Sequence, residues 1–310
     1  MKPTLYIPNF NGAAHLPRVL ESLRRQSRPL DVVLVDNGSA DDSVALVRER
    51  FAEVAVVEHG ANLGFGPALN RAVAERGGDP VVLLNNDAEC EPRFAEALLD
   101  GLGEGVDSVA GVLVQERAPS LIDSAGVVAD ATLMGFDYLH GEPLERALSA
   151  PAPLGPTGGA ALYRRAAFDA VGGFDERIFL YYEDLDLALR LAAAGGRCRL
   201  AGEARALHAY SASLGAGSGA KFAHTGWSRG YMLRRYGVMA SPRLALRALA
   251  CETALCAGQL LLDRTAKGLG GRLRGWRDGA GLPPRQAPER GLLDLSARQA
   301  LALRRRRRGG

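Results

Sequence analysis

The stretch Val81-Val82-Leu83-Leu84-Asn85-Asn86-Asp87 joins four apolar residues directly to a polar cluster that ends in a carboxylate. A short, fully apolar run is typical of a strand buried inside a parallel sheet. Helical patterns stand on both sides of it, one beginning near Pro67 and running to about Arg76, the other beginning at Pro92. The stretch therefore predicts a buried strand between two helices, with polar side chains at its carboxyl end.

The same alternation extends through the first half of the chain. Four further short strands are predicted at residues 4–8, 32–35, 54–57 and 109–114, each adjoining a helical pattern. Such alternation favours an α/β fold of the doubly wound type, a mostly parallel central sheet flanked by helices with a C-terminal helical extension. Because ligands of these sheets bind beyond the carboxyl ends of the strands, the polar motifs there are the candidate site. Residues 115–157 are rich in Gly, Pro and Ala and are expected to be irregular.

Length and charge divide the chain into three predicted parts. The 310 residues suffice for one large α/β domain, placed at residues 1–240, followed by a helical extension at 241–303 and a disordered basic tail at 304–310. Residues 241–310 hold 15 Lys or Arg against 5 Asp or Glu, whereas the first 240 hold 23 basic and 30 acidic residues. The acidic part suits a metal site, and the basic part suits phosphate of lipid or nucleic acid.

Cysteine usage and the N-terminus predict a cytoplasmic protein. None of the four cysteines forms a CxxC pair, so neither a zinc nor a disulfide framework is expected. Met1-Lys2-Pro3 leads into a short apolar strand without the longer apolar segment of a secretory leader. No stretch of about 18 uncharged apolar residues predicts a transmembrane helix.

Three polar, glycine-containing motifs follow the first three predicted strands: Pro8-Asn9-Phe10-Asn11-Gly12, Val35-Asp36-Asn37-Gly38-Ser39 and Asn62-Leu63-Gly64-Phe65-Gly66. Loops at strand ends wrap nucleotides in many α/β proteins, and the Asp36 carboxylate suits a base or ribose. Taken singly, a plain turn is the simpler explanation, because Asn and Gly are common turn formers. The GxGxxG fingerprint of dinucleotide-binding proteins is absent after the first strand.

Asp87 is a candidate metal ligand. Mg²⁺ and Mn²⁺ bind oxygen ligands and commonly bridge one or two carboxylates to substrate phosphates. A capped turn before the helix at Pro92 is the alternative explanation. His208 follows a short apolar stretch and is a candidate to complete the metal site, although a lone His is more often a surface or satisfied core residue.

The cluster Glu183-Asp184-Leu185-Asp186 opens a helix predicted over residues 184–194. Acids at a helix N-terminus interact favourably with the helix dipole, which is a structural explanation. The same dipole keeps a carboxylate ionised, as a general base at neutral pH requires. Asp186 and Arg190 are spaced for an i,i+4 ion pair, which gives Asp186 a structural role.

Taken together, these motifs resemble glycosyltransferase family 2, the inverting group with the GT-A fold, and in particular its bacterial rhamnosyltransferase-like members. The motifs occur in the family's order across residues 4–237, with Gly158 and Gly172-Gly173-Phe174-Asp175 preceding the acidic cluster and His208 following it. The resemblance implies a nucleoside-diphosphate-sugar donor and a divalent cation, Mg²⁺ or Mn²⁺. It also implies an acceptor hydroxyl on a glycan or polyprenyl-linked molecule in cell-surface polysaccharide synthesis, with rhamnose as the expected sugar.

The resemblance assigns roles to individual residues. It makes Asp184 the catalytic base with Glu183 beside it as the second acid of the motif, and it makes Asp87 and His208 the metal ligands. Asn85 stands where the family's metal motif begins with an acid, so the site has less charge. The residues expected to bind the nucleotide sugar are Pro8, Asn9, Asn11, Asp36, Asn37, Asn62, Gly64, Phe65 and Asn86.

Two other function classes require different residues at these positions. A nucleotidyltransferase on a similar sheet requires a basic, glycine-rich loop after the first strand, and Pro8-Asn9-Phe10-Asn11-Gly12 has no basic residue. A catalytically silent sugar-nucleotide binder is favoured by loss of Asp184 or Asp87, yet both are present.

The basic C-terminal region has two explanations. It is either an amphipathic surface that contacts anionic lipid at the inner face of the membrane, or a set of helices packed on the catalytic domain. No nucleic acid partner is expected, because the arginine run lacks interleaved aromatic residues. The residues of the predicted lipid-binding surface are Leu244, Leu249, Leu255, Leu260 and Leu261 with Arg243, Arg247, Arg264 and Lys267.

Overall fold

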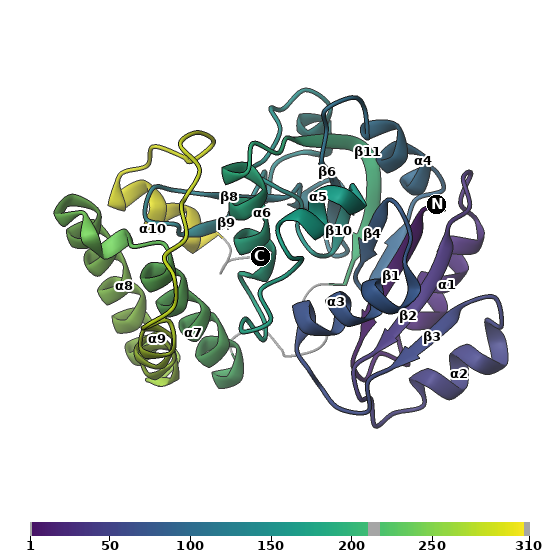
Figure 1. Ribbon diagram of the computed structural model, residues 1–310, viewed down its shortest axis with the longest axis horizontal. Helices are drawn as coiled ribbons and strands as arrows, with labels where there is room; N and C mark the ends of the chain where they lie inside the picture. The colour runs from purple at the N-terminus through teal and green to yellow at the C-terminus, as the bar shows by residue number, and fades with distance from the viewer. Residues whose placement is uncertain (1, 210–217, 307–310) are drawn as a thin grey trace.

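The computed structural model describes residues 2–209 and 218–306 (Figure 1). Its strands are β1 (Thr4–Asn9), β2 (Asp31–Asp36), β3 (Ala55–Glu58), β4 (Val81–Leu84), β5 (Ala88–Cys90), β6 (Ser108–Gln115), β7 (Ile122–Ser124), β8 (Val127–Ala129), β9 (Gly135–Asp137), β10 (Ala160–Tyr163) and β11 (Cys198–His208). Its α-helices are α1 (Leu16–Arg24), α2 (Ser43–Arg50), α3 (Phe65–Arg76), α4 (Phe94–Gly101), α5 (Arg165–Ala170), α6 (Glu183–Ala193), α7 (Gly219–Arg235), α8 (Pro242–Leu262), α9 (Lys267–Asp278) and α10 (Ala297–Arg306), and two short 3₁₀ helices are η1 (Leu144–Leu148) and η2 (Val238–Ala240).

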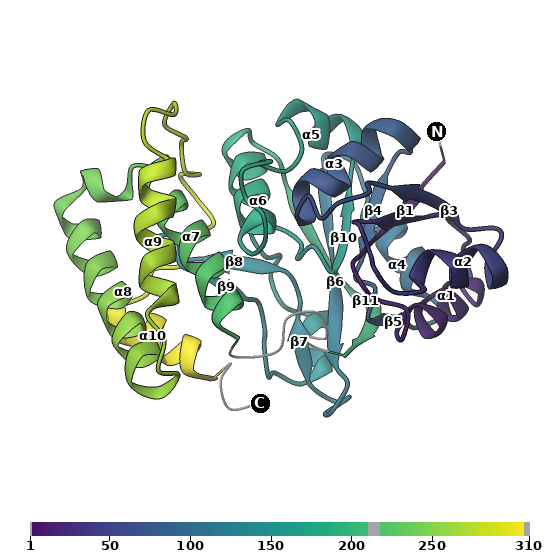
Figure 2. The same ribbon diagram turned by 90° about the horizontal axis from the view of Figure 1, so that it is seen from below.

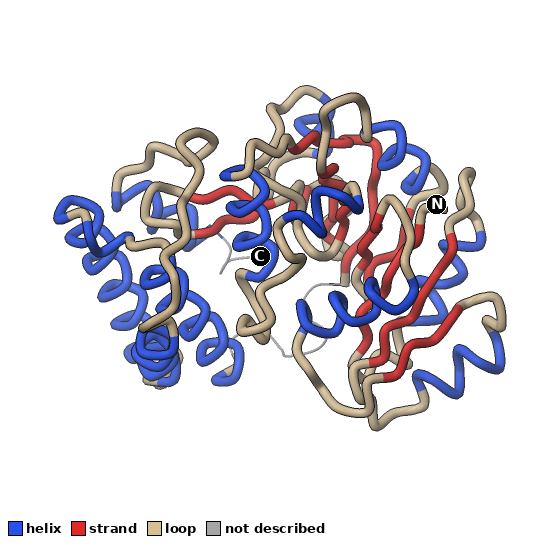
Figure 3. The backbone as a smooth tube through the Cα atoms, in the orientation of Figure 1, coloured by secondary structure: helices blue, strands red, loops and turns tan. Residues whose placement is uncertain are grey.

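The main sheet runs in the order β3-β2-β1-β4-β10-β6-β11-β5, with β7 paired to β6. Strands β3, β2, β1 and β4 are mutually parallel, as are β6 and β11. Strand β10 is antiparallel to both of its neighbours, β4 and β6. The predicted α/β fold with a central sheet flanked by helices is confirmed, and Figure 3 shows the main sheet as a curled layer. The sheet is mixed and not mostly parallel, because β10, β5 and β7 each run antiparallel to the strands that they pair with.

The apolar runs form strands because both of their faces are covered. Successive side chains of a strand point to opposite faces: Leu5 and Ile7 of β1 pack into the core shared with α1, α2 and α4, whereas Tyr6 packs into the core shared with α3, α5 and α6. The four residues of β4 are all buried, as the apolar run predicted. The helices therefore fix the sheet from both sides and leave the strand ends for the site.

Residues 115–157, expected to be irregular, contain strands β7, β8 and β9 and the 3₁₀ helix η1, so that expectation is wrong in part. Strands β8 and β9 form a separate two-stranded sheet. Asp130 follows β8 and is fully buried, and its Oδ2 lies 2.6 Å from Nη2 of Arg247 on α8. This pair links the segment to the C-terminal helices.

The C-terminal helices share a core with the catalytic part of the chain. Leu185 and Leu189 of α6, Tyr231 of α7 and Ala248 of α8 belong to one buried cluster. Helices α7 and α9 lie side by side (Figure 2) and meet through glycines. A Cβ at Gly275 would overlap the backbone of Trp227, so only glycine permits this close approach. Of the two explanations given for the extension, packing on the domain applies to these inner faces.

Helix α10 corrects the predicted start of the tail. Its backbone is helical as far as Arg306, so the disordered tail expected from residue 304 is wrong for residues 304–306, and 307–310 lie outside the described residues. The physical reason is a capped run of good helix formers. The Ser296 hydroxyl accepts from the backbone N–H of Gln299 at 3.3 Å, in the manner of a capping box.

Within the described part of the chain, one helix, α8, is long enough and apolar enough to cross a membrane, judged by length and composition alone. The sequence predicted no such helix. Only 22% of the most apolar 18-residue stretch of α8 is buried inside the protein. Two of its three charged residues pair with the rest of the molecule, Arg247 with Asp130 and Glu252 with Arg229. These ion pairs hold one side of α8 against the protein.

Candidate active site

The carboxyl ends of β1, β2 and β4 bring the predicted nucleotide-binding motifs together. Asn9 lies opposite Asp36 in the β1–β2 register, and its Nδ2 donates to Asp36 Oδ1 at 3.1 Å. The other Asp36 oxygen accepts from the backbone N–H groups of Gly38 and Ser39 at 3.2 and 3.1 Å. Asn86, beyond β4, donates to Asn9 Oδ1 at 2.9 Å. Three strand ends therefore form one hydrogen-bonded network around the Asp36 carboxylate.

Asn37 connects this network to the loop before α3. Its Nδ2 donates to Asn62 Oδ1 and to the Gly64 carbonyl, both at 3.0 Å, and its Oδ1 accepts from the Leu63 N–H at 2.8 Å. Gly64 has φ +93°, and a Cβ there would lie 2.5 Å from the Phe179 carbonyl oxygen. The position requires glycine for its backbone angle and for this close approach.

The remaining predicted nucleotide residues lie at the same edge of the sheet. Pro8 pairs with Val35 in the β1–β2 register. Asn11 is exposed, with a left-handed backbone, and its Oδ1 accepts from the Ala40 N–H at 2.8 Å. Phe65 is half-buried at the start of α3. The structure thus brings all nine predicted residues to neighbouring strand ends.

His208, the last residue of β11, lies beside Asp87. Its Nε2 is 3.3 Å from Asp87 Oδ1 and 3.2 Å from Asn85 Nδ2. Its Nδ1 is 2.7 Å from Oδ2 of Asp123, a buried residue of β7. The sequence did not single out Asp123, because it lies in a segment without a recognisable motif. Burial alone would lower the pKa of His208, but the hydrogen bonds and charges of Asp123 and Asp87 outweigh it and raise that pKa to about 10.

Asp87 and His208 are a donor set that fits a divalent cation. A carboxylate and an imidazole together suit a first-row transition metal such as Mn²⁺. Over the described ranges, no group of three or more His, Cys, Asp or Glu side chains is arranged to hold a metal. A cation held by these two residues would therefore take its other ligands from phosphate and water, as Mg²⁺ commonly does.

The Glu183-Asp184 pair opens α6 after a left-handed turn. Tyr182 has φ +73°, so the chain reverses directly before the acids. Asp184 Oδ1 accepts from the Leu185 N–H at 2.7 Å, and its Oδ2 accepts from Thr157 Oγ1 and the Gly158 N–H, both at 3.3 Å. These donors fix the orientation of the Asp184 carboxylate.

Burial dominates the electrostatics of both acids. It raises the pKa of Asp184, while the N–H groups of Leu185 and Gly158 partly offset the shift. Burial, followed by the charge of Asp184, raises the pKa of Glu183 well above its ordinary value. The buried Glu183 Oε2 has no hydrogen-bond partner among the residues that the structure describes. A raised pKa in a fixed carboxylate is typical of a general base that works near neutral pH.

A two-glycine turn before β10 connects the two halves of the site. The Asn85 N–H donates to the Gly159 carbonyl at 3.1 Å, while the neighbouring Gly158 N–H donates to Asp184. A Cβ at Gly158 would lie 2.8 Å from the Phe65 ring. The candidate metal motif, the candidate base and the loop before α3 therefore meet at this turn, which the antiparallel β10 places in the middle of the sheet.

A family model described as glycosyl transferase family 2 matches residues 4–172, more than half of the chain. The chain belongs to glycosyl transferase family 2. It is 34% identical over 237 residues to the "N-acetylglucosaminyl-diphospho-decaprenol L-rhamnosyltransferase" of Mycobacterium tuberculosis, covering 66% of this chain and 75% of that protein. It is also 34% identical over 201 residues to the succinoglycan biosynthesis protein ExoA of Rhizobium meliloti, covering 62% of this chain and 58% of ExoA.

Solved structures of glycosyltransferases share the fold of this family 2 enzyme. A mannosyltransferase of Pyrobaculum calidifontis, in complex with GDP-Man and Mn²⁺, superposes with a TM-score of 0.55 at 19% identity, covering 90% of this chain and 87% of the other. The structure of GalNAc-T7 with UDP, GalNAc and Mn²⁺ gives a TM-score of 0.61 at 14% identity, covering 92% and 55%. The predicted GT-A fold is confirmed, and the chain is a glycosyltransferase.

The helix bearing the candidate base of this glycosyltransferase is held by a buried ion cluster. The predicted pair of Asp186 and Arg190 is confirmed at 2.8 Å. Arg285, from the segment after α9, lies 2.6 Å from Asp186 and 2.8 Å from Asp175, which also accepts from the Tyr231 hydroxyl at 2.6 Å. No local pattern marks Arg285, because it stands alone in an irregular Pro-rich segment.

Proposed function

We propose that this family 2 glycosyltransferase transfers a sugar from a nucleoside-diphosphate donor to an acceptor hydroxyl with inversion, and that Asp184 is the base. The supporting observation is the turn Gly158-Gly159, whose two residues contact the Asp184 carboxylate and the metal motif at once. In a single displacement, Asp184 takes the acceptor proton while the hydroxyl oxygen bonds to the anomeric carbon. The bond from that carbon to the nucleoside diphosphate breaks, and its electron pair leaves with the diphosphate.

The donor nucleotide binds at the ends of β1, β2 and β4 in this proposal. Asp36 retains acceptor capacity on Oδ1, whose one hydrogen bond comes from Asn9, so it suits an N–H or hydroxyl group of the nucleoside. Asn37 and Asn86 orient the surrounding loops.

Asp87 and His208 would hold a divalent cation, which neutralises charge on the leaving diphosphate. The solved mannosyltransferase and GalNAc-T7 complexes with Mn²⁺ support a cation here. We propose Mn²⁺ in preference to Mg²⁺, because the site offers an imidazole and the neutral Asn85 in place of a second carboxylate.

The donor and acceptor classes follow from the Mycobacterium relative, whose name gives a rhamnosyl donor and an N-acetylglucosaminyl-diphospho-decaprenol acceptor. We propose a nucleoside-diphosphate-rhamnose donor and a polyprenyl-diphosphate-linked sugar acceptor for this chain.

Transfer of this kind requires access to lipid, and exposed leucines of α8 and α9 support a peripheral membrane contact. Seven leucines there are between 47% and 77% exposed, and we name them the leucine face. Leu244 and Leu255 of the predicted surface instead pack against buried clusters, and Arg247 pairs with Asp130. The leucine face comprises Leu246, Leu249, Leu260, Leu261, Leu262, Leu269 and Leu273.

Exposed leucines beside basic residues are typical of helices that lie in the interface of anionic membranes. Sedimentation with anionic and neutral vesicles tests the contact. Wild-type protein is expected to pellet with anionic vesicles, and the Leu261→Ser/Leu273→Ser double variant is expected to stay in solution. Leu148→Ser, which changes a leucine 56% exposed on η1, is the control. Equal pelleting of all three proteins would contradict the membrane contact.

The function is tested by a donor screen that detects nucleoside diphosphate release with Mg²⁺, Mn²⁺ or chelator. Asp184→Asn is expected to lower turnover by a factor on the order of 10² to 10⁴, the usual contribution of a general base, while nucleotide binding is retained. Asp169→Asn, a substitution at an acid of α5 whose side chain is 53% exposed, is the matched control. Near wild-type turnover of Asp184→Asn would rule out its role as base.

A further inference from the structure

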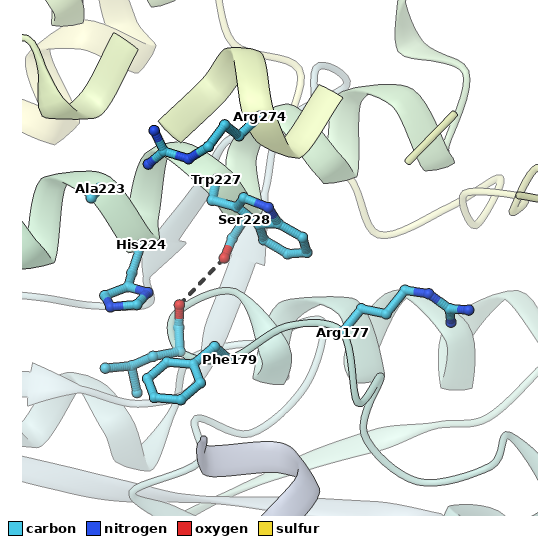
Figure 4. A pocket seen from close by; sticks show the side chains of 8 residues that line it. Arg177, Phe179, Ala223, His224, Trp227, Ser228 and Arg274 are labelled. Atoms are coloured by element: carbon cyan, nitrogen blue, oxygen red, sulfur yellow. Dashed lines mark hydrogen bonds between the residues drawn. The ribbon is translucent and has the colours of Figure 1, made fainter. Parts of the chain in front are cut away.

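A cavity of about 270 Å³ lies between the loop before α6 and helices α7 and α9. Figure 4 shows Arg177 and Phe179 on one wall, with His224, Trp227 and Arg274 on the other. Its volume is slightly below the roughly 300–1,000 Å³ of drug-sized ligand pockets. It therefore suits one sugar or phosphate-bearing head group.

One wall of the cavity is the loop before α6, which also contacts the segment that begins α3. Phe179 and Leu180 line it, and they stand shortly before the Glu183-Asp184 pair in the chain. The Phe179 carbonyl accepts from the Phe65 N–H at 2.8 Å, so the same loop contacts the segment that begins α3. The Leu180 carbonyl accepts from the Ser228 hydroxyl of α7 at 3.3 Å. A ligand in the cavity is thus next to the loop that positions the base.

The lining combines aromatic rings with positive charge. The rings of Phe179 and His224 stack at a centroid distance of 5.0 Å, and Trp227 stacks on Tyr231 at the same distance. No Asp or Glu is among the described residues that line the cavity. Arg274 is exposed on α9 and forms no salt bridge with any part of the chain that the structure describes. Burial and the positive charge of Arg274 lower the pKa of His224.

These features match an anionic sugar head group. Aromatic faces pack against the apolar faces of sugar rings, and a guanidinium binds phosphate through paired N–H donors. Arg274 also follows directly on Leu273 of the leucine face, so a lipid attached to the head group has an apolar surface beside it. A role for Arg274 in a structural ion pair does not explain its position, because it is exposed and no carboxylate is among the described residues that line the cavity.

We propose that this cavity binds the sugar-diphosphate head of the acceptor, with Arg274 contacting the diphosphate, and with Trp227 and the stacked pair of Phe179 and His224 beside the sugar. The inference rests on the proposed function for the acceptor class, and it adds a site outside the motifs of the family. It assigns the C-terminal helices α7 and α9 a direct part in acceptor recognition.

Two measurements on the full chain test this proposal. The first is steady-state transfer to N-acetylglucosamine linked through diphosphate to a short prenyl chain. Arg274→Gln is expected to raise the acceptor KM by about tenfold to a hundredfold, as loss of a charge-assisted hydrogen bond does, without changing the donor KM. Arg277→Gln is the control, because Arg277 lies one turn further on α9, is 75% exposed and pairs with Asp278.

The second measurement does not need turnover. The chain has two tryptophans, so in a Trp276→Phe background Trp227 is the only one. Quenching of Trp227 fluorescence by the same acceptor analogue, weakened by Arg274→Gln and not by Arg277→Gln, supports the site. If both variants transfer the sugar with the same acceptor KM and show the same quenching, the proposed acceptor site is wrong and the proposed function stands. Specific quenching without transfer contradicts the proposed function and leaves the site intact.

Discussion

Arg285 offers the sharpest test of how this glycosyltransferase holds its base. Its Nη1 lies 2.6 Å from Asp186 Oδ1 and 2.8 Å from Asp175 Oδ2, and these two acidic side chains are 0% and 3% exposed. Arg285→Met removes the positive charge and leaves a side chain of similar length. Because breaking a buried ion pair costs about 3–5 kcal/mol, the free energy of unfolding is expected to fall.

The partners that Asp186 and Asp175 keep in Arg285→Met determine how far the free energy of unfolding falls. Asp186 keeps Arg190 at 2.8 Å and the Tyr236 hydroxyl at 2.9 Å, and Asp175 keeps the Tyr231 hydroxyl at 2.6 Å. Arg285 itself is 19% exposed, so water screens part of the interaction. The low end of the range, about 3 kcal/mol, is therefore expected, which corresponds to a fall in Tm of roughly 6–12 °C.

The loss also depends on pH with a definite sign. Burial would raise the pKa of Asp175, but the Tyr231 hydroxyl, the Arg177 N–H and the Arg285 charge hold it below its ordinary value. A group with a lowered pKa in the folded state stabilises it above the unfolded value, about 3.9, and that contribution disappears as pH falls. The difference between wild type and Arg285→Met should therefore narrow below about pH 4.

Urea unfolding at pH 7 and at pH 3.5 measures both effects. Arg277→Met is the control, because Arg277 is 75% exposed and its loss should change stability by less than about 0.5 kcal/mol. A loss below about 1 kcal/mol for Arg285→Met at pH 7 would refute the reasoning. A difference that widened toward acid pH would refute the electrostatic part of it.

Three further predictions concern the acids and the helix packing. Glu183→Gln should reduce the decline in Tm that accompanies rising pH. The pKa of the buried Glu183 is raised, so the folded state loses stability as the pH rises above the ordinary pKa of Glu. An unchanged dependence of Tm on pH in the variant would contradict this. Asp123→Asn should weaken Mn²⁺ binding by about 10- to 100-fold, because Asp123 Oδ2 lies 2.7 Å from His208 Nδ1 and orients that ring. The electron paramagnetic resonance signal of free Mn²⁺ measures the affinity. Equal affinity of the variant and wild type would exclude this role of Asp123. Gly275→Ala should lower the free energy of unfolding, measured by urea denaturation, by about 1–3 kcal/mol, because the added Cβ would overlap the backbone of Trp227. Gly258→Ala is the control and should not lower it, because a Cβ there meets nothing within 4 Å.

The sequence by itself determined where five buried strands lie and which polar residues follow them. The apolar runs of β1, β2, β3, β4 and β6 predicted buried strands, because a strand covered on both faces must be apolar on both. Asp36, Asp87 and Asp184 stand directly at predicted strand or helix ends, where ligands of such sheets bind, although each motif taken singly also fits a turn or a helix cap. The order of these motifs also predicted the family.

Only the tertiary structure decided what surrounds those residues. Asp123 reaches His208 across the sheet, and Arg285 reaches Asp186 from a segment with no periodicity at all. A single acid or arginine far along the chain has no local pattern, since its partner is set by packing and not by sequence spacing. The antiparallel direction of β10 is of the same kind, because it is set by the neighbouring strands β4 and β6 and not by its own sequence. That direction brings Gly158 and Gly159 between the base and the metal motif, because the carboxyl end of β4 lies beside the amino end of an antiparallel partner.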